Sequence, residues 1–137
     1  MKDGNMMNEP ETIAKILRMK TIAVVGISEK EERPSFRVAS YLKGHGYQIV
    51  PVNPMISEWQ GKKCYPNLEA IPFDIDVVDI FRKSGEATSV VASAIAIGAK
   101  AVWMQEGVVN SSAAADSEEA GLLVVMDRCF MKEHAKE

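Results

Sequence analysis

Cysteine is scarce in this 137-residue sequence, and long hydrophobic runs are missing. Two cysteines, Cys64 and Cys129, are too few for a disulfide framework, so nothing indicates an oxidising compartment. The longest nearly apolar run, 90–99, has about half of the roughly 20 residues that a transmembrane helix needs. The first dozen residues are polar and contain no hydrophobic signal segment. We therefore expect a cytoplasmic protein with no membrane partner.

Positive charge is not in excess either. The sequence has 16 Lys and Arg against 19 Asp and Glu, a net charge of -3, so no global positive field favours nucleic acid as a partner. Hydrophobic residues make up 47% and charged residues 26%, which excludes wholesale disorder. Because no repeat, low-complexity tract or linker divides the chain, we expect one domain over 1–137, with 1–8 as a mobile tail.

Short apolar runs alternate with longer helical patterns along the chain. Strands are predicted at 21–25, 47–52, 76–81, 100–104 and 122–126, and helices at 8–19, from 35 to 44, 84–97, 112–120 and 128–136. Asn8 and Ser84 are the expected caps of two of these helices. The alternation implies right-handed βαβ crossovers, and hence an α/β, Rossmann-like, doubly wound parallel five-stranded sheet with helices on both faces. We expect the strand order 3-2-1-4-5.

Sheets of this kind bind ligands beyond the carboxyl ends of their strands, here near a switch point expected between strands one and four. In the loop after the first strand, Gly26 allows a sharp turn and a close approach of the backbone to a ligand. The next helix offers N–H groups to a phosphate, while Ser28, Ser35 and Arg33 add donors. A tight turn before a capped helix, with Arg33 in solvent, explains this loop equally well.

A nicotinamide cofactor is disfavoured on two counts. The G-x-G-x-x-G fingerprint is absent, because Ser28 and Glu31 stand where its second and third glycines would be. Asn53 occupies the end of the second strand, where NAD-binding proteins place an acidic residue for the ribose. The amide can still bond a base or ribose, although an ordinary turn also explains Asn53-Pro54.

The loops after the third and fourth predicted strands carry further candidates. Ile80 and Phe81 can flank an adenine, and Arg82 can neutralise a phosphate; the alternative is a core Phe beside a solvated cation. Gln105, Glu106 and Gly107 directly follow a buried strand, a position that often faces a ligand but is also commonly polar.

Cysteine and histidine suggest little further chemistry. Cys129 lies beside Arg128 at the start of a predicted helix, and both features favour a thiolate, yet an incidental thiol is the simpler interpretation. His45 and His134 have no partners at metal-ligand spacing, so we expect no metal site.

Taken together, these loops resemble the stand-alone CoA-binding domain proteins of bacteria and archaea, which are similar to the N-terminal CoA-binding domain of the succinyl-CoA synthetase α subunit. The resemblance rests on five segments in order and covers nearly the whole chain: 26–28 with 33–35, 51–54, 76–82, 103–107 and 127–129. It implies coenzyme A or an acyl-CoA as the ligand. The cofactor-binding residues that it implies are Gly26, Ile27, Ser28, Arg33, Pro34, Ser35, Asn53, Pro54, Ile80, Phe81, Arg82, Gln105, Glu106 and Gly107.

The resemblance also suggests a placement for each part of the ligand. The loop from Gly26 to Ser28 would lie against the pyrophosphate or pantetheine arm, and Asn53 with Pro54 near the adenosine. Ile80 and Phe81 would pack on the adenine, with 105–107 as the opposite wall.

Two departures from the synthetase pattern bear on function. Met55 and Ile56 replace a lysine, so the 3′-phosphate must rely on Arg33, Arg82 or Lys62. The synthetase's phosphorylated histidine belongs to a second domain that this sequence does not contain.

We therefore expect a non-catalytic carrier, sensor or partner subunit, either a homodimer or associated with another protein. A CoA-dependent transferase or thiol-exchange enzyme using Cys129 is the first alternative, and an NAD(P)-binding oxidoreductase is the second. Gly26→Val is expected to abolish ligand binding while leaving the fold mostly intact.

Overall fold

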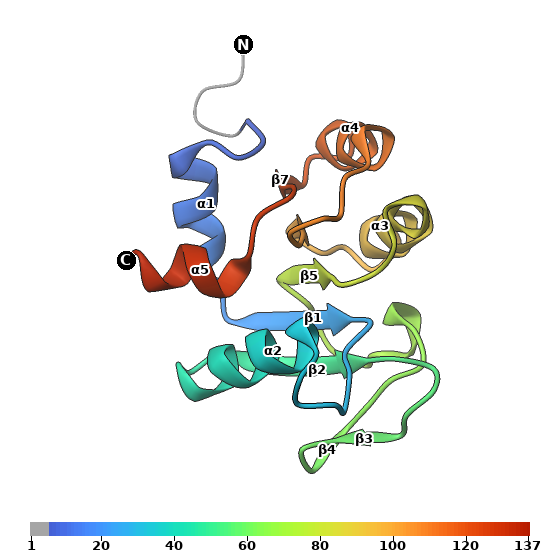
Figure 1. Ribbon diagram of the computed structural model, residues 1–137. Helices are drawn as coiled ribbons and strands as arrows, with labels where there is room; N and C mark the ends of the chain where they lie inside the picture. Colours follow the sequence, from blue (N-terminus) through green and yellow to red (C-terminus); the bar gives the residue numbers. More distant parts are fainter. Residues whose placement is uncertain (1–5) are drawn as a thin grey trace.

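The computed structural model describes residues 6–137 and contains the predicted parallel sheet (Figure 1). Its strands are β1 (Thr21–Val25), β2 (Gln48–Val52), β5 (Val77–Ile80), β6 (Ala101–Met104) and β7 (Leu123–Val125). The helices are α1 (Pro10–Leu17), α2 (Pro34–Gly44), α3 (Ala87–Ala96), α4 (Ser111–Glu119) and α5 (Phe130–Ala135). Shorter elements are β3 (Glu58–Trp59), β4 (Lys62–Lys63) and the 3₁₀ turns η1 (Leu68–Ala70) and η2 (Ser84–Glu86). The α/β, doubly wound class is confirmed.

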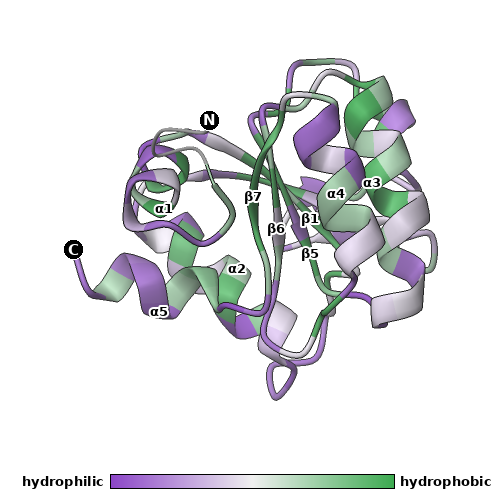
Figure 2. Cartoon of the chain, turned by 90° about the horizontal axis from the view of Figure 1, so that it is seen from above, coloured by the Kyte–Doolittle hydropathy of each residue, from purple (hydrophilic) through white to green (hydrophobic). Residues whose placement is uncertain are grey.

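Helices cover both faces of the sheet, as Figure 2 shows from above: α1, α2 and α5 lie on one side, and α3 and α4 on the other. Each strand contributes side chains to the core on both faces of the sheet, because successive side chains point to opposite faces. In β1, Ile22 and Val24 pack under α2 and α5, whereas Ala23 and Val25 pack under α3. β1, β5 and β6 are therefore buried on both faces, which is typical of a parallel sheet.

The strand order differs from the prediction. The sheet runs β2-β1-β5-β6-β7, which is 2-1-3-4-5 in the numbering of the five predicted strands and not 3-2-1-4-5. The third predicted strand, β5, pairs with β1, with Ile22 opposite Val77. The switch point consequently lies between β1 and β5.

Proline explains why β5 does not pair with the outer edge of β2. The carbonyl of Pro51 faces this edge, where it accepts a hydrogen bond from the N–H of Tyr65 at 2.9 Å. A proline has no N–H, so this edge cannot support a full ladder. Tyr65 makes a single parallel bridge to Val52 there, followed by a bond from Asn53 N–H to the Tyr65 carbonyl.

The first described residues cover the opposite edge of the sheet. The Asn8 side chain donates to the Met126 carbonyl at 2.9 Å and accepts from the Met126 N–H at 2.8 Å. Asn8 therefore does not cap α1, whose N-cap is Glu9, and it instead bonds to the chain directly after β7. Residues 1–5 of the expected tail lie outside the described residues. No helix within 6–137 is long and apolar enough to cross a membrane.

Candidate functional site

A cavity of about 950 Å³ opens at the carboxyl ends of β1, β5 and β6, beside the switch point. Its size lies within the range typical of small-molecule sites. The walls come from the β1–α2 loop, the first turns of α2 and α5, and the segments after β5 and β6. The predicted site residues that line it are Gly26, Ser28, Arg33, Pro34, Ser35, Phe81, Arg82, Gln105, Glu106 and Gly107.

The other predicted residues lie elsewhere. Ile27 and Ile80 are fully buried in the core. The Asn53 side chain donates to the Ile27 carbonyl at 2.8 Å and so holds the β1–α2 loop instead of lining the cavity. Pro54 lines a second cavity of about 280 Å³, between the end of β2 and α3. Lys62 lines neither cavity.

Arg82 and Glu86 line both cavities, so these side chains stand where the two spaces adjoin. They form an ion pair with 3.0 Å between Arg82 Nε and Glu86 Oε1. This hydrogen bond to Arg82 lowers the pKa of Glu86. An elongated ligand can therefore extend from one cavity into the other past this pair.

The backbone of Gly26 passes very close to the end of β5 at the switch point. Its φ is +87°, and a Cβ added to it would lie 2.2 Å from the Phe81 carbonyl oxygen. Its own N–H donates to the Val52 carbonyl at 2.9 Å, so this amide is already used. The expectation that Gly26→Val would leave the fold mostly intact is therefore wrong, because any side chain here collides with the backbone of the neighbouring strand end.

Two residues of the β1–α2 segment that line the cavity have a backbone N–H available to an anion. The N–H groups of Ser28 and Ser35 make no hydrogen bond to any residue in 6–137. The loop is held by bonds from Lys30 N–H to Ser28 Oγ at 3.0 Å and from Trp59 Nε1 to the Ser28 carbonyl at 2.9 Å. At the start of α2, Pro34 has no N–H, and the N–H groups of Phe36 and Arg37 donate to the Arg33 carbonyl. The helix therefore offers a phosphate in the cavity the Ser35 N–H and its dipole.

The cavity concentrates positive charge although the chain is acidic overall. Its two carboxylates are neutralised by Arg82 and by Lys132, whose Nζ lies 3.0 Å from Glu106 Oε2. Its six cations are Lys30, Arg33, Arg37, Arg82, Lys83 and Lys132. The two ion pairs therefore leave four cationic side chains that form no salt bridge within the part of the chain described.

Sequence reasoning missed several of these cations. Lys30 looked like part of a solvated loop and Lys83 like a solvated side chain. Arg33 and Arg37 lie one helical turn apart, and this spacing was the signal that could have placed both on the cavity side of α2.

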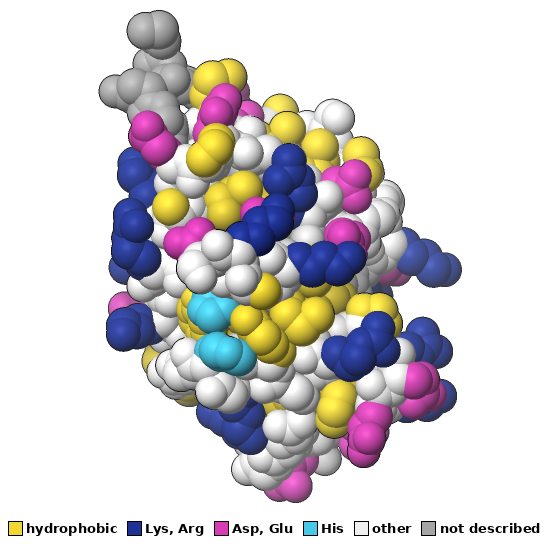
Figure 3. Space-filling model, turned by 60° about the vertical axis from the view of Figure 1, so that its left-hand side comes forward, with side chains coloured by type: hydrophobic (Ala, Val, Ile, Leu, Met, Phe, Trp, Pro, Cys, Tyr) yellow, Lys and Arg dark blue, Asp and Glu magenta, His cyan; other side chains and the backbone are white. Residues whose placement is uncertain are grey.

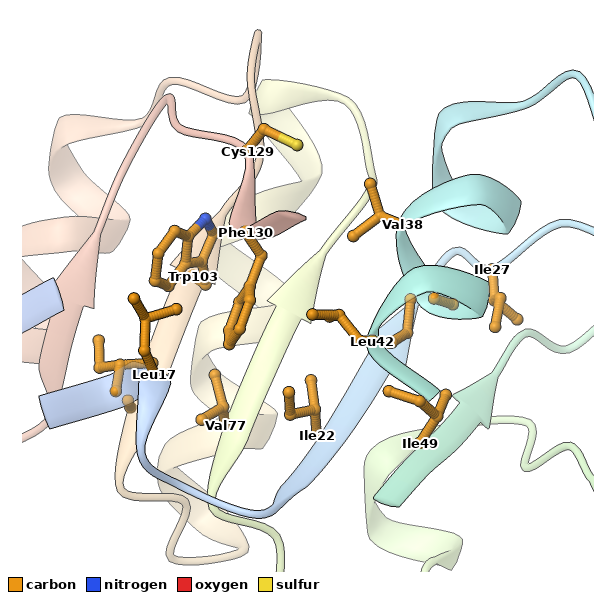
Figure 4. Close-up of a cluster of buried hydrophobic side chains, with 14 of the residues drawn as sticks. Leu17, Ile22, Ile27, Val38, Leu42, Ile49, Val77, Trp103, Cys129 and Phe130 are labelled. Carbon is orange, nitrogen blue, oxygen red and sulfur yellow. The ribbon is translucent and has the colours of Figure 1, made fainter. Parts of the chain in front are cut away.

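The wall formed by α5 is tied to β6. Trp103 Nε1 donates to the Arg128 carbonyl at 2.8 Å, and the Phe130 N–H donates to Gln105 Oε1 at 3.1 Å. The rings of Trp103 and Phe130 pack with 4.4 Å between their centroids (Figure 4). Cys129 lies between Arg128 and Phe130 in the sequence, so these contacts hold it in place where it lines the cavity.

Asp79 is the second site feature that the sequence did not reveal. It is fully buried in the middle of β5, and neither carboxylate oxygen has a hydrogen-bond partner among the described residues. Burial raises the pKa of this carboxyl well above its ordinary value. A carboxyl that holds its proton more tightly than usual therefore lies on the strand that ends at the cavity.

The two histidines, by contrast, meet on the surface formed by α2 and α5 (Figure 3). The ring centroids of His45 and His134 are 5.1 Å apart, and Tyr41 Oη lies 2.9 Å from His134 Nδ1. Neither histidine lines the cavity. Within 6–137, no group of three or more His, Cys, Asp or Glu side chains is placed to hold a metal ion.

A doubly wound sheet with a cation-rich cavity at its switch point defines a Rossmann-like domain suited to a phosphate-bearing ligand. Comparison with known proteins identifies the family more closely. Residues 20–135 match the model of the CoA binding domain, and the chain belongs to this family. The expected resemblance to CoA-binding domain proteins is confirmed.

Relatives of similar length share the whole domain. The uncharacterised protein YneT of Bacillus subtilis is 39% identical over 118 residues, which are 86% of this chain and 87% of that protein. A hypothetical protein from Pyrococcus horikoshii OT3 superposes with a TM-score of 0.90 at 42% identity, covering 99% of this chain and 98% of that one.

A longer relative shares only part of the domain. The ADP-forming acetate–CoA ligase II of Archaeoglobus fulgidus is 36% identical over 63 residues, which are 44% of this chain and 9% of the ligase. The chain thus matches a small piece of that enzyme.

Proposed function

We propose that this protein binds coenzyme A or an acyl-CoA in the cavity at the carboxyl ends of β1, β5 and β6. Its role is that of a carrier, sensor or partner subunit without a reaction of its own. The membership of the CoA-binding domain family and the partial match to an acetate–CoA ligase support coenzyme A as the ligand.

The single observation that carries the proposal is the accumulation of cations around the β1–α2 loop in an acidic protein. Coenzyme A carries a diphosphate and a 3′-phosphate, and each phosphate needs donors and positive charge. The free N–H groups of Ser28 and Ser35 suit the diphosphate, and the Arg33 guanidinium can hold phosphate oxygens in a forked geometry.

The two cavities suggest how the ligand is oriented. The adenosine would enter the smaller cavity beside Pro54, with Arg82 at the junction of the two spaces. The pantetheine arm would then cross the larger cavity toward Gln105 and Cys129. In this orientation Phe81 contacts the arm, whereas Ile80 has no exposed surface to offer to the adenine.

Isothermal titration calorimetry with coenzyme A tests the proposal through a reversal of charge. Arg33→Glu should weaken binding at least tenfold, because it places a negative charge beside the diphosphate. Arg18→Glu is the matched control, since Arg18 follows α1 and precedes β1, at the end of the sheet opposite the cavity. Equal affinities of the two variants, or tighter binding of NADH than of coenzyme A by the unaltered protein, would reject the proposal.

A further inference from the structure

Cys129 is a buried thiol that faces the cavity. It is 5% exposed, lines the larger cavity, and is held in place by the flanking bonds of Arg128 and Phe130. Figure 4 shows its sulfur on the side facing Val38, across the end of β5. Since Val38 also lines the cavity, a reagent reaches this sulfur through the same space that would hold a ligand.

Asp79 supplies an independent observation at the same place. Side chains 77, 79 and 81 of the β5 segment point to one face, where Val77 joins the core and Phe81 lines the cavity. Asp79 lies between them on this face, opposite Trp103 in the sheet register, and is fully buried next to the residues that line the cavity. Buried polar groups are nearly always hydrogen-bonded, so a carboxyl with two unpartnered oxygens points to a partner that a ligand provides.

We infer that Cys129 is a redox attachment site at which the protein becomes joined to coenzyme A through a mixed disulfide. The inference rests on the proposed function, because the phosphates must first bring the ligand into the cavity. The co-reactant is coenzyme A disulfide or another disulfide of coenzyme A.

The exchange step balances without any further reagent. The Cys129 thiolate attacks one sulfur of the ligand's disulfide, a bond forms between the two sulfurs, and the ligand's S–S bond breaks. The departing coenzyme A thiolate takes up the proton that Cys129 gave up. One disulfide and one thiol are consumed, and one disulfide and one thiol are formed.

A cationic side chain lies close to Cys129 on the same wall of the cavity. Lys132, one helical turn further along α5, lines the same cavity. Its pKa is raised by the hydrogen bond and the charge of Glu106.

The second cysteine provides a control within the same chain. Cys64 is also 5% exposed, but it lines neither cavity, and its Sγ donates to the Asn53 carbonyl at 3.6 Å. Burial raises the pKa of the Cys64 thiol. Cys64 is thus as buried as Cys129 but lacks the route through the cavity.

The test is intact-mass spectrometry, without reductant, after incubation of the full chain with coenzyme A disulfide. The unaltered protein and Cys64→Ser should each gain one coenzyme A, released again by dithiothreitol, whereas Cys129→Ser should gain none. Pantethine, the corresponding disulfide without phosphates, should modify Cys129 at least tenfold more slowly.

Calorimetry with reduced coenzyme A separates this inference from the proposed function. If Cys129→Ser binds coenzyme A but the unaltered protein gains no adduct, the attachment site is rejected and the binding function stands. An adduct on Cys64, or equal rates with pantethine, also rejects the attachment site. If no form of the protein binds coenzyme A, both proposals fall together.

Discussion

Two aspartates on one short segment have opposite effects on stability. Asp76 is desolvated, which by itself raises its pKa, but hydrogen bonds from the N–H groups of Thr21 and Lys20 and the charge of Lys100 outweigh this and lower it. Its stabilising contribution is present above the pKa of the unfolded chain and is lost as the pH falls through the lower folded value. Asp79 has a raised pKa, so the folded state retains a proton that the unfolded state releases.

The first prediction concerns Asp79→Val. Because the unfolded carboxyl ionises above about pH 4 and the folded one does not, Asp79 makes the protein less stable as the pH rises through that range. Removing the unpartnered carboxyl should raise the free energy of unfolding by about 1–3 kcal/mol. Urea unfolding at pH 4 and pH 7 should show a larger gain at pH 7.

If the ligand supplies the missing hydrogen-bond partner of Asp79, the same variant should also bind coenzyme A several-fold more weakly. Asp79→Asn is the matched comparison, since it keeps a hydrogen-bond donor without an ionisable group. A gain in stability that is identical at both pH values would show that Asp79 is ionised in the folded protein.

At the scale of elements, Asn8 protects an edge strand. Its side chain occupies the hydrogen-bonding groups of Met126 directly after β7, and its own N–H donates to the Val124 carbonyl at 3.3 Å. Its φ of 63° is a conformation that asparagine and glycine accept more readily than alanine. An uncovered edge is a template for pairing between molecules.

The second prediction follows from this geometry. Asn8→Gly should lower the free energy of unfolding by about 1–2 kcal/mol through the lost side-chain bonds. Asn8→Ala should cost more, because it loses the same bonds and must also adopt the strained φ. Chemical unfolding measures both, and light scattering should show more association in both variants. If alanine proves no worse than glycine, the positive φ is not a source of strain.

The elements also show how far the sequence could predict this fold. Strands and helices were found within a few residues, because apolar runs and helical stripes are local signals. The order of the strands was missed because it depends on which edge each strand pairs with. Pro51 carried the missing information: it marks β2 as the edge strand, which leaves the far side of β1 to β5.

The candidate site, like the fold, could be predicted from the sequence only in part. The loops at the strand ends were found from topology and turn residues, and most of their side chains do line the cavity. Asn53 was misplaced because an amide that could bond a ligand is used to hold Ile27. Asp79 was missed because nothing in a local pattern shows that a strand carboxyl lacks partners in three dimensions.

At the scale of the whole molecule, charge is separated. The chain carries a net charge of -3, yet six cations and two carboxylates line the larger cavity. The residues outside the cavity therefore carry a net negative charge, which disfavours the binding of an anionic ligand there. This separation can give selectivity for anions without a globally basic protein.

The third prediction is a dependence on salt that only the cavity cations produce. Raising sodium chloride from about 50 to about 500 mM shortens the screening length severalfold and should weaken coenzyme A binding at least threefold. Lys83→Gln removes one of these cations and should show weaker binding at low salt with a shallower dependence, whereas Lys20→Gln, before β1, should follow the unaltered protein. Calorimetry at several salt concentrations gives these slopes. Parallel slopes for all three proteins would mean that the cavity charges do not act on the ligand, and that binding depends on packing against the apolar walls alone.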